Sequence, residues 1–224
     1  MAIAAAQSGA NVAFTYLNSK GEAKATVDEL NAFAVKGLAI QCDVRSEKSI
    51  QKAVAAIARQ FQSIDVLINN AGIFETAPFQ EITAAQWDGV FATNVRGPFL
   101  MSQQCLPALR KSRGRIIHLG SLGGIKPWIT HAHYCSSKAA LHMLTQVMAK
   151  ALAPEIAVNC VAPGMIVAKT GVRDVKLLNR TAERTPVRRN GTPDDVVSAV
   201  MYFATAPTFI TGQILTVDGG LALA

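Results

Sequence analysis

This chain of 224 residues carries a tyrosine and a lysine four positions apart, Tyr134 and Lys138, a pair that can transfer protons. A spacing of four places the phenol and the ammonium group on one face of a helix, one turn apart. A lysine charge beside a phenol favours the phenolate, which lowers the tyrosine pKa from its usual value of about 10. The pair can therefore act as a general acid or base.

A hydroxyl earlier in the chain strengthens this interpretation, because a Tyr–Lys pair alone also occurs by chance on exposed helices. Ser121 lies thirteen residues before Tyr134, in the glycine-rich segment Gly120-Ser-Leu-Gly-Gly124. An apolar strand is expected just before it, at residues 115–119. Such a loop presents its side chains at the carboxyl end of a strand, where α/β sheets bind ligands.

Apolar strand patterns and amphipathic helix patterns alternate along the whole chain. This alternation is typical of a parallel sheet covered by helices on both faces, the doubly wound α/β class. Strands are expected at residues 11–16, 37–41, 64–69, 115–119, 156–161 and 214–217. Helices are expected at residues 1–7, 20–34, 46–61, 83–108, 134–152 and from 192, with capping residues at Thr83 and Thr192.

The length and the absence of a Gly-, Ser- or Pro-rich linker favour a single domain over residues 1–224. Residues 164–192 carry little regular pattern and are longer than an ordinary loop. Long ordered loops are usually functional. We therefore expect this stretch to be a flap over the substrate.

Composition argues against several classes of protein. Half of the residues are apolar, yet no apolar run approaches the roughly 18 residues of a membrane-spanning helix. The chain has no basic residue before Lys20 and no signal-peptide pattern, so a cytoplasmic location is expected. The net charge of +7 comes from scattered residues without interleaved aromatics, which argues against nucleic-acid binding.

Metal and disulfide sites are not expected either. The cysteines are far apart and form no CxxC pair, and the histidines have neither ligand spacing nor a carboxylate cluster beside them. The cysteines are Cys42, Cys105, Cys135 and Cys160, and the histidines are His118, His131, His133 and His142.

Six motifs in order resemble those of the short-chain dehydrogenase/reductase family, and the resemblance spans nearly the whole chain. They are Asn69-Asn-Ala-Gly72, Asn94-Val-Arg-Gly-Pro-Phe99, Ser121, Tyr134-Cys-Ser-Ser-Lys138, Asn159-Cys-Val-Ala-Pro-Gly164 and Thr211-Gly-Gln-Ile-Leu-Thr-Val-Asp-Gly-Gly220. The resemblance implies a Rossmann-like, three-layer fold and an NAD(P)-dependent oxidoreductase.

The resemblance also implies roles for four residues. Tyr134 would pass a proton to or from the substrate oxygen, and Lys138 would lower the tyrosine pKa and hold the nicotinamide ribose. Ser121 would hydrogen-bond the reacting carbonyl. Asn94 would hold a water that links the lysine to solvent. The redox chemistry itself would belong to the cofactor.

Further positions are implied as cofactor contacts. By resemblance, the adenine end is bordered by Asp43 and Val44, the adenine ribose by Asn70, Ala71 and Gly72, and the nicotinamide by Pro163, Gly164 and Ile166. Tyr134 and Lys138 also count among the implied cofactor contacts. A threonine often found two residues beyond that isoleucine is replaced here by Ala168, with Thr170 further on. Whether Thr170 or the backbone takes its place stays open.

The segment after the strand at residues 11–16 bears on the choice of cofactor. NAD-preferring members usually carry an acid there, whereas this chain has Asn18, Ser19 and Lys20. These side chains would accept a 2′-phosphate rather than repel it. We therefore expect NADP(H) to be preferred, with NAD(H) as the alternative.

The nearest subgroup in overall appearance is the 3-oxoacyl-[acyl-carrier-protein] reductase type, so a 3-oxoacyl thioester is one candidate substrate. A sugar, steroid or small ketone is the alternative, with Trp128 or His133 lining the pocket. Arg110, Lys111 and Arg113, together with Arg173 and Lys176, would offer a basic surface to an acidic carrier protein. The resemblance implies a homotetramer, with a dimer next.

The first residues, Met1-Ala-Ile-Ala, align with the family just after its first strand and its glycine-rich phosphate loop. We therefore expect this strand and loop to be missing, which would leave two inner strand edges unpaired. A sequence that is N-terminally short would account for this. If the loop is truly absent, a non-catalytic protein that senses a cofactor or binds a partner is the alternative function.

Overall fold

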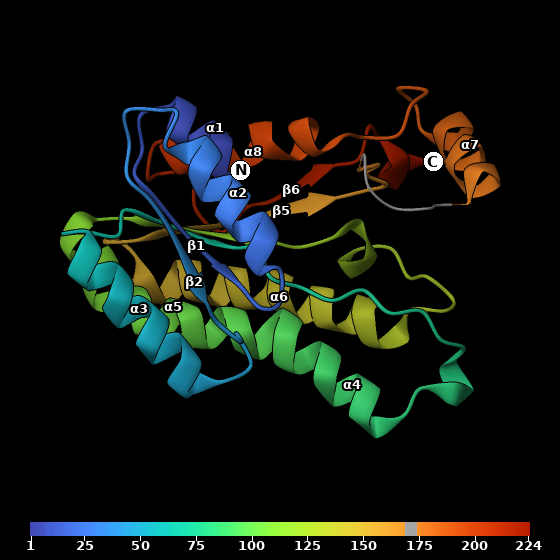
Figure 1. Ribbon diagram of the computed structural model, residues 1–224. Helices are drawn as coiled ribbons and strands as arrows, with labels where there is room; N and C mark the ends of the chain where they lie inside the picture. Colours follow the sequence, from blue (N-terminus) through green and yellow to red (C-terminus); the bar gives the residue numbers. More distant parts are fainter. Residues whose placement is uncertain (169–173) are drawn as a thin grey trace.

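The computed structural model describes residues 1–168 and 174–224, which form three layers (Figure 1). The middle layer holds the parallel strands β1 (Val12–Tyr16), β2 (Gly37–Gln41), β3 (Val66–Asn69), β4 (Arg115–Leu119), β5 (Ala157–Pro163) and β6 (Ile214–Val217). One face is covered by α3 (Glu47–Gln60), α5 (Gly97–Ser112) and α6 (Ala132–Leu152), and the other by α1 (Ala2–Gln7), α2 (Lys20–Leu30) and α8 (Pro193–Thr205). The expected α/β class is confirmed.

Strand β4 shows why the strands are continuous apolar runs. Ile116 enters the core that contains Leu109 of α5 and Leu152 of α6. Ile117 points the other way, into the core that contains Val200 of α8. Successive side chains of a strand alternate between its faces, so a sheet with helices on both sides favours apolar residues at successive positions.

The sheet is divided between β1 and β3. Among the described residues β1 pairs with β2 alone, whereas β3 begins a separate sheet of order β3-β4-β5-β6. A cavity of about 1060 Å³ lies along the two facing edges, lined by both strands and by side chains of α1, α3 and α5. The two unpaired inner edges that the sequence analysis expected are therefore present.

The helix expected over residues 83–108 is two helices joined by a π-helical turn. Thr83 and Gln86 form the expected capping box at the start of α4 (Ala84–Phe91). The π-helical turn η2 (Ala92–Arg96) follows and carries Asn94, and α5 then continues to Ser112. π turns inside helices are frequent at functional sites because they redirect a side chain.

A helix that the sequence analysis missed lies in the stretch 164–192. Helix α7 (Val175–Arg184) begins at Asp174, whose carboxylate accepts hydrogen bonds from the N–H groups of Lys176 and Leu177. Its sequence is largely polar, so the apolar repeat that reveals the other helices is short. The Val167 N–H donates to the Gly191 carbonyl at 2.8 Å, which ties the two ends of this stretch together.

Helix α8 begins as expected, because Thr192 and Asp195 form a reciprocal capping box with Pro193 in the first turn. Strands β2, β4 and β6 have the expected bounds, and β1, β3 and β5 differ by one or two residues at an end. In the part of the chain that the structure describes, no helix is both long and apolar enough to span a membrane.

Candidate active site

The structure brings Ser121, Tyr134, Lys138 and Asn94 together beyond the carboxyl end of β4. Ser121 is separated from the end of β4 by Gly120 and is the N-cap of the short 3₁₀ turn η3 (Leu122–Gly124), where its Oγ accepts from the Gly123 N–H at 3.0 Å. Tyr134 and Lys138 lie in the first two turns of α6, and Asn94 lies in the π turn. Residues far apart in the sequence thus meet where α/β sheets bind ligands.

Lys138 is buried, with 5% of its surface exposed. Its Nζ donates to the Leu119 carbonyl at 2.7 Å and lies 5.8 Å from the centre of the Tyr134 ring. Burial lowers the pKa of Lys138 to about 8, because a low-dielectric environment disfavours the ammonium form. The lysine is therefore fixed beside the tyrosine by the backbone at the end of β4.

The Tyr134 phenol differs from the expectation in one respect. Burial raises its pKa, and the hydrogen bond with Ser121 opposes the shift without cancelling it. The Tyr–Lys spacing by itself predicts that the lysine charge lowers this pKa. In the structure the phenol is largely desolvated and Nζ is directed at a carbonyl oxygen, so burial is the larger influence. The phenol holds its proton at neutral pH.

Asn94 is fully buried and connects two segments. Its Oδ1 accepts from the Ile73 N–H at 2.9 Å, while its Nδ2 donates to the Ile73 carbonyl at 3.0 Å and to Ser137 Oγ at 3.1 Å. Asn94 therefore holds the segment after β3 against α6. Gly72 lies in this segment, and a Cβ there would be 3.3 Å from Asn94 Oδ1 and 3.6 Å from Lys138 Nζ.

An aromatic wall formed by Phe74, Trp128 and His131 borders Tyr134. The Phe74 ring meets the Tyr134 ring edge-on at 4.8 Å between centres, and Trp128 stacks on it at 6.1 Å. The His131 ring is fixed by hydrogen bonds of 3.0 Å to the hydroxyls of Thr76 and Thr130.

The sequence placed His131 near the expected substrate and named Trp128 as a pocket residue, but it did not single out Phe74. The aromatic character of Phe74, two residues after the Asn69–Gly72 motif, was the available signal. His133, the other residue expected to line the pocket, is fully buried, with its Nε2 3.8 Å from Glu75 Oε2.

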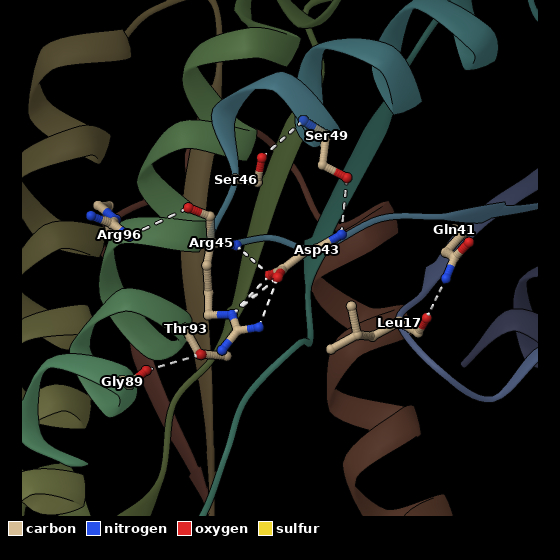
Figure 2. Close-up of polar contacts among 9 residues, drawn as sticks. All are labelled: Leu17, Gln41, Asp43, Arg45, Ser46, Ser49, Gly89, Thr93 and Arg96. Carbon is tan, nitrogen blue, oxygen red and sulfur yellow. Dashed lines mark hydrogen bonds and ion pairs between the residues drawn. The ribbon is translucent and has the colours of Figure 1, made fainter. Parts of the chain in front are cut away.

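Asp43 and Val44 lie in the segment that follows β2, and Figure 2 shows the polar contacts of Asp43 there. The Arg45 guanidinium pairs with the Asp43 carboxylate, with Nε 2.9 Å from Oδ1 and Nη2 2.8 Å from Oδ2, and this pairing lowers the Asp43 pKa. The Arg45 carbonyl accepts from Arg96 Nη2 at 3.3 Å, and the Asp43 N–H donates to Ser49 Oγ at 3.1 Å. The carboxylate is thus held in one orientation at the carboxyl end of β2.

The other expected cofactor residues lie at the same edge of the strands. Asn18 and Ser19 follow β1, residues 70–72 follow β3, and residues 163–166 end or follow β5. The Gly164 N–H donates to the Val217 carbonyl at 3.0 Å, and a Cβ on Gly164 would lie 2.7 Å from that of Asp218. Thr170 and Arg173 lie outside the described residues.

This set of residues fits a nicotinamide dinucleotide in its chemistry. Asp43 supplies acceptors for an amino group, Ser19 keeps a hydroxyl that makes no helix-capping bond, and Lys138 supplies a cation. Gly72 leaves its backbone uncovered next to Asn94 and Lys138. These groups are spread along one edge of the sheet, as an extended dinucleotide requires.

The basic residues Arg110, Lys111 and Arg113, which were expected to face a carrier protein, do not lie beside the candidate active site. Arg110 and Lys111 lie in the last turn of α5 and Arg113 follows it, just before β4 begins at Arg115. They are therefore at the amino end of the sheet, whereas Ser121 is at the carboxyl end. Lys176, the other described member of the expected basic surface, lies in α7, within the stretch 164–192.

Comparisons with known proteins identify the family of this chain. The protein-family model described as "Enoyl-(Acyl carrier protein) reductase" matches residues 1–222. The chain is 36% identical over 225 residues to the 3-oxoacyl-[acyl-carrier-protein] reductase FabG of Staphylococcus epidermidis, covering 99% of this chain and 92% of the relative.

Two solved structures have nearly the same fold. A Serratia marcescens short-chain dehydrogenase/reductase mutant is 33% identical with a TM-score of 0.93, covering 99% of this chain and 91% of that one. A Burkholderia cenocepacia gluconate 5-dehydrogenase in complex with NADP and tartrate is 28% identical with a TM-score of 0.92, covering 100% and 89%. The chain therefore belongs to the short-chain dehydrogenase/reductase family and is an NAD(P)-dependent oxidoreductase.

Proposed function

We propose that the protein interconverts a ketone and a secondary alcohol with NADP(H), using Tyr134 as the proton donor or acceptor. The observation that carries this proposal is the meeting of Tyr134, Ser121 and Lys138 at the end of β4. The nicotinamide supplies or takes the hydride, and the protein residues handle the proton and the charge.

The roles of these residues in the reducing direction follow from their positions. The Tyr134 phenol is protonated at neutral pH, so it can give its proton to the carbonyl oxygen as negative charge develops there. The Ser121 hydroxyl donates a hydrogen bond to the same oxygen. The buried Lys138 ammonium group stabilises the phenolate left behind.

We assign to Asn94 the task of holding the segment after β3 beside Lys138. Its side-chain amide is already bonded to Ile73 and Ser137. A water held near Asn94 as a proton path to solvent stays a prediction from the family resemblance.

The preference for NADP(H) is supported by the residues after β1. Asn18, Ser19 and Lys20 precede or begin α2, and the first turn of this helix has its acid at Glu22 rather than beside Asn18. The N-terminus of a helix favours a phosphate because its N–H groups and dipole point toward the ligand. The related Burkholderia cenocepacia structure contains NADP.

Cofactor preference gives a direct prediction for an acidic substitution at Asn18. The kcat/KM of the wild-type protein should be higher with NADPH than with NADH, and Asn18→Asp should lower the NADPH value about tenfold, since a carboxylate repels a 2′-phosphate. Steady-state kinetics with both cofactors measures this. The matched control is Asn31→Asp at the other end of α2, which adds the same charge and should leave the ratio unchanged. A wild-type preference for NADH would contradict the assignment.

For the substrate we propose a 3-oxoacyl thioester first, because the curated relative from Staphylococcus epidermidis reduces 3-oxoacyl groups according to its name. The test mixes the protein, NADPH and an acetoacetyl thioester and follows the loss of NADPH absorbance, with gluconate or acetoin and NADP as the comparison. Turnover of the thioester supports the proposal. Turnover of the other compounds alone would move the protein to a sugar or small-alcohol dehydrogenase.

A binding measurement distinguishes the proposed enzyme from the alternative of a non-catalytic protein. Calorimetry should detect NADPH binding to the wild-type protein. If no nicotinamide cofactor binds, the proposed reaction is wrong, and the cofactor-sensing or interaction role becomes the better explanation for a sheet divided between β1 and β3.

We also propose that the protein is a homotetramer. Exposed apolar side chains gather on two sets of elements, and burying such patches is what subunit association achieves. The first set lies on α5 and α6 and comprises Phe99, Met143 and Val147, and the second lies on α8, β6 and the loop between them and comprises Tyr202, Phe209 and Leu215.

A further inference from the structure

His142 continues the helix face that carries the two reactive residues of α6. It lies four residues after Lys138 and eight after Tyr134, so all three side chains fall along one side of the helix. Its ring is largely buried, with 8% of the residue exposed. The proposed reaction does not use this imidazole, so its place beside the site needs another explanation.

The imidazole of His142 is seated between two glycines of the loop that holds Ser121. A Cβ on Gly120 would lie 2.3 Å from His142 Nε2, and a Cβ on Gly124 would lie 2.6 Å from His142 Cε1. Both distances are far below van der Waals contact. The two glycines therefore allow the loop to close over this ring, which explains why the segment after β4 is glycine-rich.

The His142 ring also bonds the backbone of Ser121. The Ser121 N–H donates to His142 Nε2 at 3.4 Å, and Ser121 is itself buried. Within residues 1–168 and 174–224 this imidazole is the acceptor for that N–H. A buried donor that loses its acceptor destabilises the conformation that buries it, so this bond favours one position of the loop.

The bond requires an unprotonated Nε2, and the surroundings of His142 keep it so. Burial, and to a smaller extent the charge of Lys138, lower the His142 pKa from 6.5 to about 4. At neutral pH the ring proton then lies on Nδ1 and the Nε2 lone pair is available to the Ser121 N–H.

We infer that His142 is a positioning residue that locks the Ser121 loop onto α6 and so aligns the Ser121 hydroxyl with the Tyr134 phenol. The inference rests on the proposed function, in which this hydroxyl holds the reacting carbonyl. It adds a residue that acts through Ser121 rather than on the substrate.

Kinetics of paired variants test the inference. His142→Leu should lower kcat about tenfold with the KM for NADPH unchanged, and His142→Gln should recover part of the loss because its amide oxygen can accept the same bond. In the Ser121→Ala background, His142→Leu should change kcat less than twofold, since its effect passes through the serine hydroxyl. If the two losses multiply instead, the inference is wrong.

A second buried histidine provides the matched control. His118 bonds Thr145 Oγ1 at 2.9 Å and does not contact the Ser121 N–H. His118→Leu and Ser121→Ala should therefore give losses that multiply, as independent sites do. Near-UV circular dichroism and thermal unfolding identify any variant that fails to fold, and His142→Gln keeps the test available if His142→Leu does not fold.

A measurement without turnover separates this inference from the proposed reaction. In hydrogen exchange followed by mass spectrometry, peptides that contain Ser121 should exchange faster in His142→Leu than in the wild-type protein, and His142→Gln should reverse the change. Unchanged exchange would overturn the inference. Absence of carbonyl turnover in the wild-type protein would overturn the proposed function alone.

Discussion

Tyr134→Phe is expected to lower kcat by about 10²–10⁴-fold, the range typical of losing a general acid. The ring remains, so its packing against Phe74 and Trp128 should persist and the protein should fold. NADPH affinity should change little, because the variant removes a hydroxyl that is directed at Ser121. Steady-state kinetics and calorimetry with NADPH measure the two effects separately.

A matched substitution on the surface completes this test. Tyr202→Phe in α8 removes the same hydroxyl from a half-exposed tyrosine far from β4's carboxyl end, and kcat should stay within about twofold of the wild-type value. Retained activity in Tyr134→Phe would show that another group donates the proton. Loss of NADPH binding in that variant would instead assign Tyr134 a role in holding the cofactor.

The stability of the fold is expected to fall as the pH drops from about 6.5 to about 4, and His118 supplies a large part of this loss. Burial, followed by the charge of Lys138, lowers the His118 pKa from 6.5 to about 4. Between these two pH values the His118 imidazole is protonated in the unfolded chain and neutral in the folded protein, so unfolding is favoured as the pH falls. Above pH 6.5 the contribution is constant.

The size of this effect follows from the width of the window. Each pH unit between the two pKa values changes the free energy of unfolding by about 1.4 kcal/mol, so His118 accounts for about 2 kcal/mol between pH 7 and pH 5. Urea unfolding at these two pH values measures it. In His118→Asn the difference between the two pH values should shrink by about that amount.

The same experiment contains its own control. A substitution that only disturbs packing lowers the free energy of unfolding equally at pH 7 and pH 5, whereas removal of a titrating group changes the difference between them. If the wild-type protein and His118→Asn lose equal stability between pH 7 and pH 5, His118 does not titrate in this window.

The local patterns of the sequence determined most of the secondary structure. Alternating apolar runs predicted every described strand, and Thr83 and Thr192 marked the starts of α4 and α8 through capping boxes that involve residues three positions apart. These features depend on neighbours in the chain, so a pattern of residue types reports them directly. Helix α7 was missed because its apolar repeat is short.

The pairing of Tyr134 with Lys138 was also readable, since a spacing of four on a helix fixes their relation. The sequence alone did not reveal the direction of the Tyr134 pKa shift or the bond between Lys138 and the Leu119 carbonyl. Both depend on which groups surround the phenol once α6 packs against β4.

Contacts between distant segments were decided by the tertiary structure. Phe74 and Trp128 contact each other beside Tyr134. His142, which lies about two helical turns after Tyr134 in α6, accepts a hydrogen bond from the Ser121 N–H. Each contact joins residues on different elements. The packing of those elements sets the distances between the side chains, and the burial of the side chains shifts the pKa values of the titratable ones. The sequence by itself determined which residues are candidates for the chemistry, and only the packing of α6 against the loop after β4 decided how those residues are held and charged.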